Sequence, residues 1–166
     1  LPKDVKAIIN FSNKIGLKPV LLNAVETTNE YQLDHLITTI KNAVGGFKSR
    51  KITILGLAFK PDTDDIRDSV SIKLIYSLLK NKAKVIVHDP KAIENTKEVF
   101  RNKITYADSL ERALNGTDCA IIMTSWRVYS QLNHIHVNKM RKRIIVDTRR
   151  ILKNHKLNIE YYPIGI

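Results

Sequence analysis

Three basic residues follow apolar runs of the sequence and could together bind a diphosphate. Lys60 and Arg67 lie in the stretch GLAFKPDTDDIRDS, and Arg149 lies in DTRRIL. An arginine guanidinium binds phosphate oxygens through forked hydrogen bonds, whereas a lysine ammonium acts as a point charge. If the three cations converge on one edge of a sheet, they form a diphosphate site.

The acidic residues between Lys60 and Arg67 admit two interpretations. The DTDD stretch could orient the cations, and the following Asp68 or Ser69 could cap a helix. Alternatively, Asp64, Asp65 and Arg67 form only a surface ion-pair cluster around a turn. The residue types alone leave both interpretations open.

The elements that must position these cations are those of a doubly wound α/β domain. Apolar strands are predicted at 51–59, 83–90, 119–125 and 143–148, with amphipathic helices at 69–82 and 109–116 and an edge strand near 159–166. Strands that are apolar on both faces and alternate with helices indicate a parallel sheet covered on both sides. In such sheets ligands bind beyond the carboxyl ends of the strands, where the three basic loops lie.

The first part of the chain is helical by its apolar spacing. One helix is predicted over 2–14 and ends at Gly16, and a long helix over 19–44 ends at Gly45 and Gly46. A long apolar stripe with only one short helical neighbour needs a further surface to cover it. We therefore expect an interface with another subunit or domain along the helix 19–44.

Several other residues of the sequence that could take part in catalysis or ligand binding are better explained by structural roles. Gly56 stands alone where a dinucleotide fingerprint needs three glycines, so we do not expect this domain to hold NAD by itself. Cys119 begins a strand with no histidine near it in sequence, which favours a buried structural cysteine. Trp126 could stack on a base or pack on the sheet edge. The histidine spacing supports no metal site.

Composition limits the class of partner and compartment. The net charge of +12 and a pI near 9.8 favour an anionic partner. A nucleic-acid-binding module is the alternative from another class. Against it, the basic residues are spread along the chain with only short clusters such as FKSRK and KMRKR, no helix concentrates them on one face, and no aromatic platform is apparent. We therefore do not expect a nucleic-acid partner. No apolar run is long enough to span a membrane. A single cysteine and no secretory leader in the chain as given indicate the cytoplasm.

GLAFKPDTDDIRDS resembles the signature of the UDP-glucose/GDP-mannose dehydrogenase family at the start of its C-terminal, nucleotide-sugar-binding domain. LPKDVKAI is similar to the tail of that family's catalytic motif, and VHDPKA, TSWRVY and VDTRRIL follow in the family's order. The resemblance implies a central helical dimerisation segment at 1–48 and a UDP-sugar-binding α/β domain at 49–166. It also implies a homodimer through the helix 19–44.

The family resemblance further implies roles for individual residues. Family members oxidise the C6 alcohol of a nucleotide sugar to a carboxylate with two NAD⁺ in succession, through a cysteine thioester. By this resemblance Asp4 belongs to the catalytic water network and Lys3 and Arg67 approach NAD. Likewise Phe59, Lys60 and Arg149 contact the nucleotide sugar.

Departures from the family pattern limit the activity expected of this chain. The family's nucleophilic cysteine would stand immediately before Leu1, and the glycine-rich NAD domain has no counterpart in these 166 residues. DTR at 147–149 replaces the family's more usual Asp-Gly-Arg, and Val70 stands where proline is common. We therefore expect a fragment of a UDP-glucose 6-dehydrogenase that is inactive alone, with UDP-N-acetylmannosamine and GDP-mannose dehydrogenases as alternatives.

Overall fold

The computed structural model describes residues 2–164, with side chains from residue 4 onward. The chain divides into two compact units, residues 1–38 and 39–166. The division falls inside one continuous helix, whose last turns carry the fully buried Ile40 and Val44 and so belong to the core of the second unit. The functional boundary expected at 48/49 stays a prediction.

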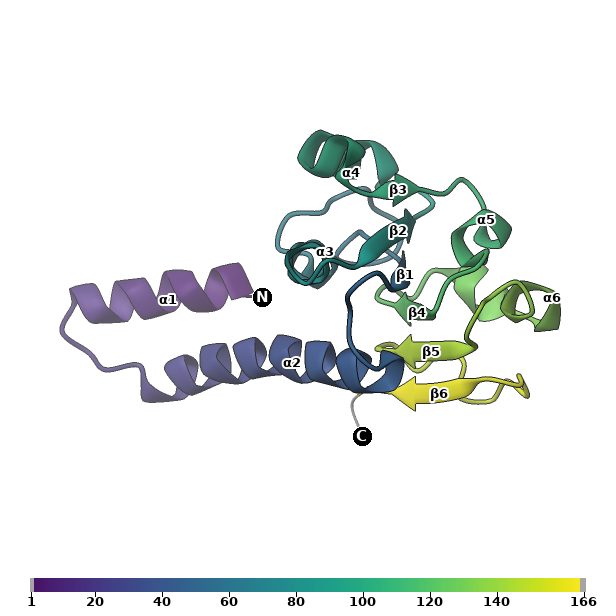
Figure 1. Ribbon diagram of the computed structural model, residues 1–166. Helices are drawn as coiled ribbons and strands as arrows, with labels where there is room; N and C mark the ends of the chain where they lie inside the picture. Colours follow the sequence, from purple (N-terminus) through teal and green to yellow (C-terminus); the bar gives the residue numbers. More distant parts are fainter. Residues whose placement is uncertain (1, 165–166) are drawn as a thin grey trace. The chain divides into compact units, whose positions relative to one another are not determined.

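The first unit contains the helix α1 (Pro2–Lys14) and most of the helix α2 (Val20–Val44), two helices that the apolar spacing predicts (Figure 1). Gly16 lies just beyond α1 with φ of +77°, a left-handed conformation that favours glycine. Lys6 Nζ of α1 and Glu26 Oε1 of α2 form an ion pair at 3.2 Å.

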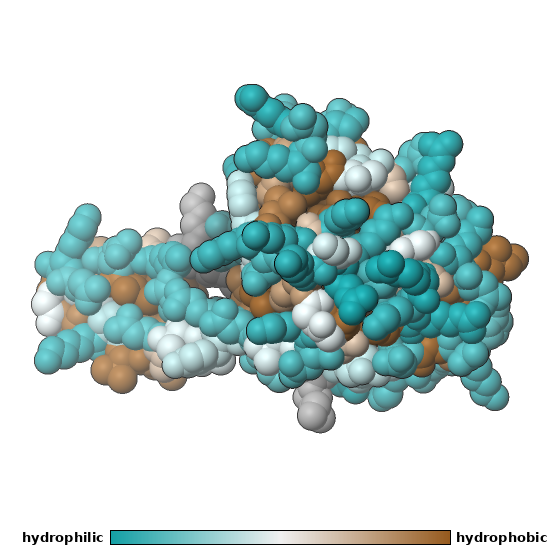
Figure 2. Space-filling view, viewed as in Figure 1, coloured by the Kyte–Doolittle hydropathy of each residue, from teal (hydrophilic) through white to brown (hydrophobic). Residues whose placement is uncertain are grey.

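Much of the apolar surface of this helical unit is exposed, and part of it is visible in Figure 2. The exposed apolar side chains are those of Ile8, Phe11, Ile15, Leu17, Val20, Leu21, Val25 and Tyr31. Leu21, at 77% exposure, illustrates how little of this surface the helical pair covers by itself. A surface of this kind is typical of an interface.

The second unit contains a six-stranded, wholly parallel sheet in the order β3-β2-β1-β4-β5-β6. The strands are β1 (Lys51–Leu55), β2 (Lys84–His88), β3 (Thr105–Tyr106), β4 (Cys119–Ile122), β5 (Ile144–Asp147) and β6 (Glu160–Pro163). This is the doubly wound α/β fold expected from the alternating pattern, with β6 as the expected edge strand.

Helices cover both faces of the sheet, α3 and α4 on one side and α5 and α6 on the other (Figure 1). They are α3 (Val70–Lys80), α4 (Ile93–Phe100), α5 (Leu110–Leu114) and α6 (His134–Val137), with short 3₁₀ helices at Arg101–Lys103 and Arg127–Gln131. Right-handed crossovers explain this arrangement, because the chain first moves from β1 toward β3 and then returns to build β4 to β6.

Among the elements that were not predicted from the sequence are the helix α4 and the strand β3. The helix α4 has few apolar residues, and only Thr96 and Phe100 of it are buried. The strand β3 has only two residues, which is too short for any periodicity. Both lie at the β3 edge of the sheet, where little apolar surface is covered and the sequence signal is correspondingly weak.

Candidate functional site

The strand order reverses between β1 and β4, which places the ligand-binding crevice of this fold beyond their carboxyl ends. The loops after these strands are connected there, because Thr124 Oγ1 donates to the Ala58 carbonyl at 2.7 Å. Gly56, with φ of +99°, lets the loops approach this closely. A Cβ at Gly56 would lie 2.5 Å from Thr124 Cβ, so this glycine serves packing between the loops.

A cavity of about 60 Å³ opens at this point. It is lined by Ala58, Phe59, Asp68, Ser69, Val70, Ser71, Met123 and Arg149. Four of these residues surround the N-terminus of α3, whose backbone N–H groups and dipole favour an anion. The cavity therefore combines a helix N-terminus with a guanidinium group.

Ser69 caps α3 and also attaches the helix to the loop after β1. Its Oγ accepts from the Ser71 N–H at 3.2 Å and donates to the Leu57 carbonyl at 2.6 Å. Ser71 Oγ donates to the Gly56 carbonyl at 2.8 Å. Of the two capping residues expected from the sequence, Ser69 is the one that caps the helix.

Arg149 is anchored at the rim of the cavity by one edge of its side chain. Its Nε donates to the Met123 carbonyl at 2.7 Å, and its backbone N–H donates to Asp147 Oδ1 at 2.9 Å. Among the described residues, no hydrogen bond uses its two Nη nitrogens. These nitrogens provide the forked donors that bind a phosphate.

Phe59 and Lys60 lie on the loop after β1, and Phe59 is one of the residues that line the cavity. Phe59 is 45% exposed, so part of its side chain is accessible. Lys60 Nζ lies 5.3 Å from the centroid of the Phe59 ring in a cation–π contact. The fold thus brings the expected Phe59, Lys60 and Arg149 to one edge of the sheet.

Asp89, at the carboxyl end of β2, is a buried carboxylate that organises these loops. Its Oδ2 accepts from the Leu57 N–H at 2.7 Å, the Ala58 N–H at 3.2 Å and the indole N–H of Trp126 at 3.1 Å. Its Oδ1 accepts from the N–H groups of Lys91 and Ala92, both at 2.8 Å. Sequence reasoning did not single this residue out, although an aspartate directly after a strand in HDP was an available signal.

Asp147, at the carboxyl end of β5, holds the loop of Arg149 in a similar way. Besides Arg149, it accepts through Oδ2 from the Leu152 N–H and the Tyr161 hydroxyl, both at 3.0 Å. Burial and the nearby Asp147 carboxylate raise the pKa of Tyr161 to about 12, so its hydroxyl remains a donor. Each loop that carries an expected ligand residue is therefore fixed by a buried aspartate.

Arg67 does not line the cavity. Its side chain is 86% exposed and pairs with Asp65, with Nη2 to Oδ2 at 2.7 Å and Nε to Oδ1 at 3.0 Å. The hydrogen bonds from Arg67 lower the pKa of Asp65 to about 2. In this structure Arg67 and Asp65 form the surface ion pair that the sequence left open as an alternative.

Lys3 and Asp4 belong to α1 in the helical unit. The side chain of Lys3 lies outside the described residues, and Asp4 is exposed in the first turn of α1, where the helix dipole favours an acid. Their expected catalytic and cofactor roles stay predictions.

A buried pair, His88 and Tyr129, supports the same end of the sheet. The Tyr129 hydroxyl donates to the His88 carbonyl at 2.8 Å, so it must accept from His88 Nδ1, which lies 3.1 Å away. Burial lowers the pKa of His88, against the opposing effect of the neighbouring Asp89. The imidazole is therefore neutral, with its proton on Nδ1.

Cys119 has the structural role that the sequence favoured, and Trp126 packs inside the fold, one of the two roles that the sequence left open. Cys119 is fully buried in β4, and burial raises the pKa of its thiol far above the usual range. Trp126 is buried and donates to Asp89. Within the part of the chain that the structure describes, no cluster of histidine, cysteine and acidic residues could hold a metal ion, and no helix is long and apolar enough to cross a membrane.

Residues 53–154 match the model of the UDP-binding domain of the UDP-glucose/GDP-mannose dehydrogenase family. The chain belongs to this family. It is 40% identical over 151 residues to the UDP-glucose 6-dehydrogenase AglM of Haloferax volcanii, covering 91% of this chain and 34% of the relative. It is 30% identical over 168 residues to the UDP-glucose 6-dehydrogenase TuaD of Bacillus subtilis, covering 99% of this chain and 36% of the relative.

Solved structures show the same relationship. A UDP-glucose dehydrogenase from Pyrobaculum islandicum superimposes with a TM-score of 0.86 at 34% identity, covering 97% of this chain and 36% of the other. A GDP-mannose dehydrogenase from Pseudomonas aeruginosa, at 22% identity and a TM-score of 0.78, shares the fold. The family and the fold inferred from the motifs are confirmed. The chain spans about a third of the length of the curated relatives that it matches.

Proposed function

We propose that the α/β unit binds the diphosphate of a UDP-sugar as part of a UDP-glucose 6-dehydrogenase. The observation that carries this proposal is the cavity at the sheet's switch point, where Arg149 and the N-terminus of α3 line the same space. Two sources of positive potential at one cavity favour a phosphorylated ligand. The match to a UDP-binding domain supports uridine as the nucleoside.

Each expected ligand residue has a distinct role in this proposal. Arg149 binds phosphate oxygens through its Nη groups while its Nε remains on the Met123 carbonyl. Lys60 adds a point charge near Phe59, and the accessible part of Phe59 packs on the nucleotide sugar. The buried aspartates hold these loops in place before the ligand arrives, which reduces the entropy lost on binding.

The reaction proposed for the whole protein is oxidation of UDP-glucose to UDP-glucuronate in two NAD-dependent steps. Relatives named UDP-glucose 6-dehydrogenase at 30% and 40% identity support the choice of sugar over N-acetylmannosamine and GDP-mannose. In this proposal Asp4 acts as a carboxylate near the hydrolytic water. A covalent cysteine and an oxyanion site would also be needed, and no residue of the described cavity provides them.

The described cavity does not fit NAD bound in the manner of a dinucleotide fold. Thr124 fills the space at Gly56 through which a pyrophosphate would approach the backbone. Arg67, the described residue expected to contact NAD, is already paired with Asp65. Contacts of Lys3 and Arg67 with NAD therefore stay predictions for the whole protein.

Homodimerisation through the helix 19–44 and a cytoplasmic location are likewise proposals. The exposed apolar residues of α1 and α2 support the homodimer.

Isothermal titration calorimetry with UDP, UDP-glucose and GDP tests the binding proposal. We expect heat with UDP and UDP-glucose and weaker binding of GDP. Arg149→Ala removes hydrogen bonds between charged groups, each worth about 1.5–3 kcal/mol, and is expected to weaken UDP binding by about 10- to 100-fold.

Arg150→Ala is the matched control, because it removes the same charge one residue away from the cavity lining. We expect it to change the dissociation constant less than about threefold. The absence of heat with all three nucleotides at millimolar concentration would refute the proposal. Equal losses in both variants would show that Arg149 acts only through net charge.

A further inference from the structure

The fold gathers basic residues from three distant segments at the edge where the parallel strands begin. The segments are 48–51 before and at the start of β1, 80–84 before and at the start of β2, and 139–143 before β5. They contain ten cations and no acidic residue. These cations, which we call the basic edge, are Lys48, Arg50, Lys51, Lys80, Lys82, Lys84, Lys139, Arg141, Lys142 and Arg143.

Backbone hydrogen bonds show that the first two segments lie side by side. The Ser49 N–H donates to the Lys82 carbonyl at 3.0 Å, and the Lys84 N–H donates to the Arg50 carbonyl at 2.8 Å. The register places Lys51 directly opposite Lys84 in the neighbouring strand. Residues more than thirty positions apart in sequence are thus adjacent in space.

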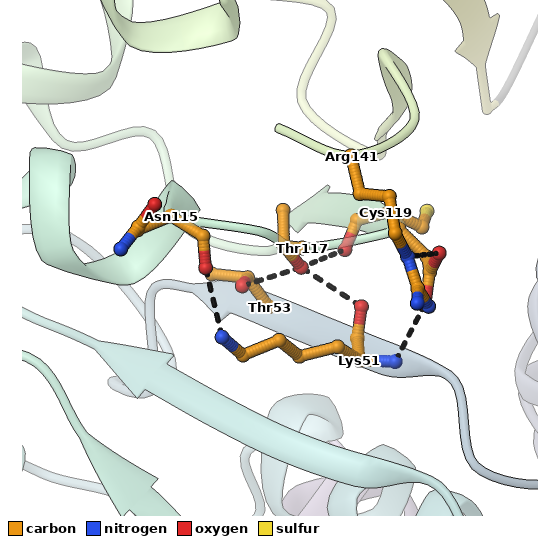
Figure 3. A network of polar contacts seen from close by, with 7 residues as sticks. Lys51, Thr53, Asn115, Thr117, Cys119 and Arg141 are labelled. Carbon is orange, nitrogen blue, oxygen red and sulfur yellow. Dashed lines mark hydrogen bonds and ion pairs between the residues drawn. The ribbon is translucent and has the colours of Figure 1, made fainter. Parts of the chain in front are cut away.

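The third segment joins the same edge through the network drawn in Figure 3. The Thr117 hydroxyl donates to the Lys51 carbonyl at 2.8 Å, and the Arg141 N–H donates to the Thr117 carbonyl at 2.8 Å. The Asp118 carboxylate accepts from the Lys51 N–H at 2.8 Å and from the Arg141 guanidinium. Asp118 is fully buried and hydrogen-bonded to these partners, so its single negative charge offsets only a small part of the positive charge of the three segments.

The helix dipole does not account for this cluster. Lys80 lies in the last turn of α3, where a cation stabilises the helix. The other nine basic residues lie outside the helices. Among the described residues, two of the ten cations have a hydrogen-bond or ion-pair partner for the side chain. Lys51 Nζ donates to the Asn115 carbonyl, and Arg141 pairs with Asp118. Most of the positive charge therefore faces solvent without a role in the fold.

Contrary to the expectation from the sequence pattern alone, we propose that the basic edge binds the phosphate backbone of a nucleic acid without reading its sequence. Neighbouring strands are about 4.8 Å apart, so the cations at the starts of β2, β1 and β5, with β4 lying between β1 and β5, extend over about 14 Å, several phosphates along one strand. The edge lies at the opposite end of the strands from the UDP cavity, so both sites can be occupied at once.

The absence of large exposed apolar side chains from this edge favours a duplex over other anionic partners. The large apolar residues exposed on the α/β unit are Phe59, Val70, Tyr76, Val99 and Ile135, and none belongs to the three segments. The edge therefore has no aromatic ring to stack on an unpaired base and no apolar anchor to insert into a membrane. Phosphate contact alone remains, and a duplex presents the denser array of phosphates.

Fluorescence anisotropy with the full 166-residue chain and a labelled duplex of about 20 base pairs tests this proposal. DNA, RNA and single-stranded forms of the same sequence are separate arms. We expect the duplex arms to bind at least as tightly as the single strand. If about five phosphates are contacted, the slope of log K against log salt is about −4.5, and affinity falls by several hundredfold between about 50 and 200 mM salt.

The decisive variant reverses Lys84, Lys142 and Arg143 to glutamate, and its control reverses Lys14, Lys18 and Lys153, which are exposed outside the basic edge. Both variants change the net charge equally. We expect the first to weaken duplex binding by more than tenfold and to make the salt slope shallower by about 2 to 3, whereas the control changes affinity less than threefold. Calorimetry with UDP checks that the first variant keeps the fold.

Three results would overturn the proposal. Equal losses in the two variants would show that only net charge matters. A salt slope shallower than about −2 would exclude an array of phosphate contacts. Tighter binding to vesicles that contain phosphatidylserine than to either duplex would assign the edge to a membrane surface. Because the basic edge and the UDP cavity share no residue, failure of nucleic-acid binding leaves the UDP proposal untouched.

Discussion

Asp89→Asn tests whether a buried carboxylate holds the candidate site together. Asp89 is 4% exposed and accepts five hydrogen bonds. The donors are the backbone N–H groups of Leu57, Ala58, Lys91 and Ala92 and the indole N–H of Trp126. Asparagine has the same shape, but one of the two oxygens becomes an NH₂ group. Whichever oxygen is replaced, two or three buried donors lose their acceptor.

The expected cost follows from the number of orphaned donors. A buried donor without a partner costs about 1–3 kcal/mol, so two of them lower the free energy of unfolding by about 2–6 kcal/mol. With an m-value of about 2 kcal/mol/M in urea, the unfolding midpoint falls by about 1–3 M. The fluorescence of Trp126, the single tryptophan, reports directly on this site, and far-UV circular dichroism follows the helices.

Asp64→Asn is the control, because Asp64 is exposed on the loop after β1 and undergoes the same chemical change. Substitutions at such surface positions usually change stability by less than about 0.5 kcal/mol. The reasoning would be refuted if Asp89→Asn lowered stability by less than about 1 kcal/mol. That result would mean that the loops do not depend on the carboxylate for their backbone hydrogen bonds.

Two further predictions concern the same end of the sheet. Gly56→Ala should destabilise the α/β unit by more than about 3 kcal/mol, because the new Cβ would collide with Thr124. The control Gly45→Ala has open space around it and should lower the stability by about 1 kcal/mol. Thermal unfolding of the two variants compares these losses. The second prediction concerns pH. Since the fold keeps His88 neutral while the unfolded chain protonates it near pH 6.5, unfolding takes up a proton at lower pH. The free energy of unfolding should therefore decrease below about pH 6.5, by at most about 1.4 kcal/mol per pH unit for this group. His88→Gln should show a smaller decrease in urea titrations between pH 7.5 and 5.5, and an unchanged pH dependence would contradict the assignment.

The sequence was sufficient to determine the class of fold and its main elements. Apolar runs such as the one beginning at Lys51 alternate with amphipathic helices. This alternation identifies a parallel sheet with helices on both faces without any tertiary information. The short strand β3 and the helix α4 were missed because edge elements bury little apolar surface. The order of the motifs also identified the family correctly.

The composition of the candidate site was only partly readable from the sequence. Phe59, Lys60 and Arg149 were predicted as ligand residues, and the fold brings them to one edge. Asp89 and Asp147 were missed, since an aspartate that accepts several backbone N–H groups has no sequence signature distinct from that of an exposed turn residue. Their role depends on burial, which is a property of the folded chain.

The distribution of charge shows most clearly what the sequence determined and what the tertiary structure decided. The sequence alone determined a net charge of +12, with basic residues spread along the chain apart from short clusters such as FKSRK and KMRKR. Only the parallel sheet brings 48–51, 80–84 and 139–143 together, because every strand of such a sheet begins at the same edge. The same rule places Phe59 and Arg149 together at the opposite edge. The residues of the two positively charged surfaces alternate along the chain, and the topology of the sheet separates them to its two ends.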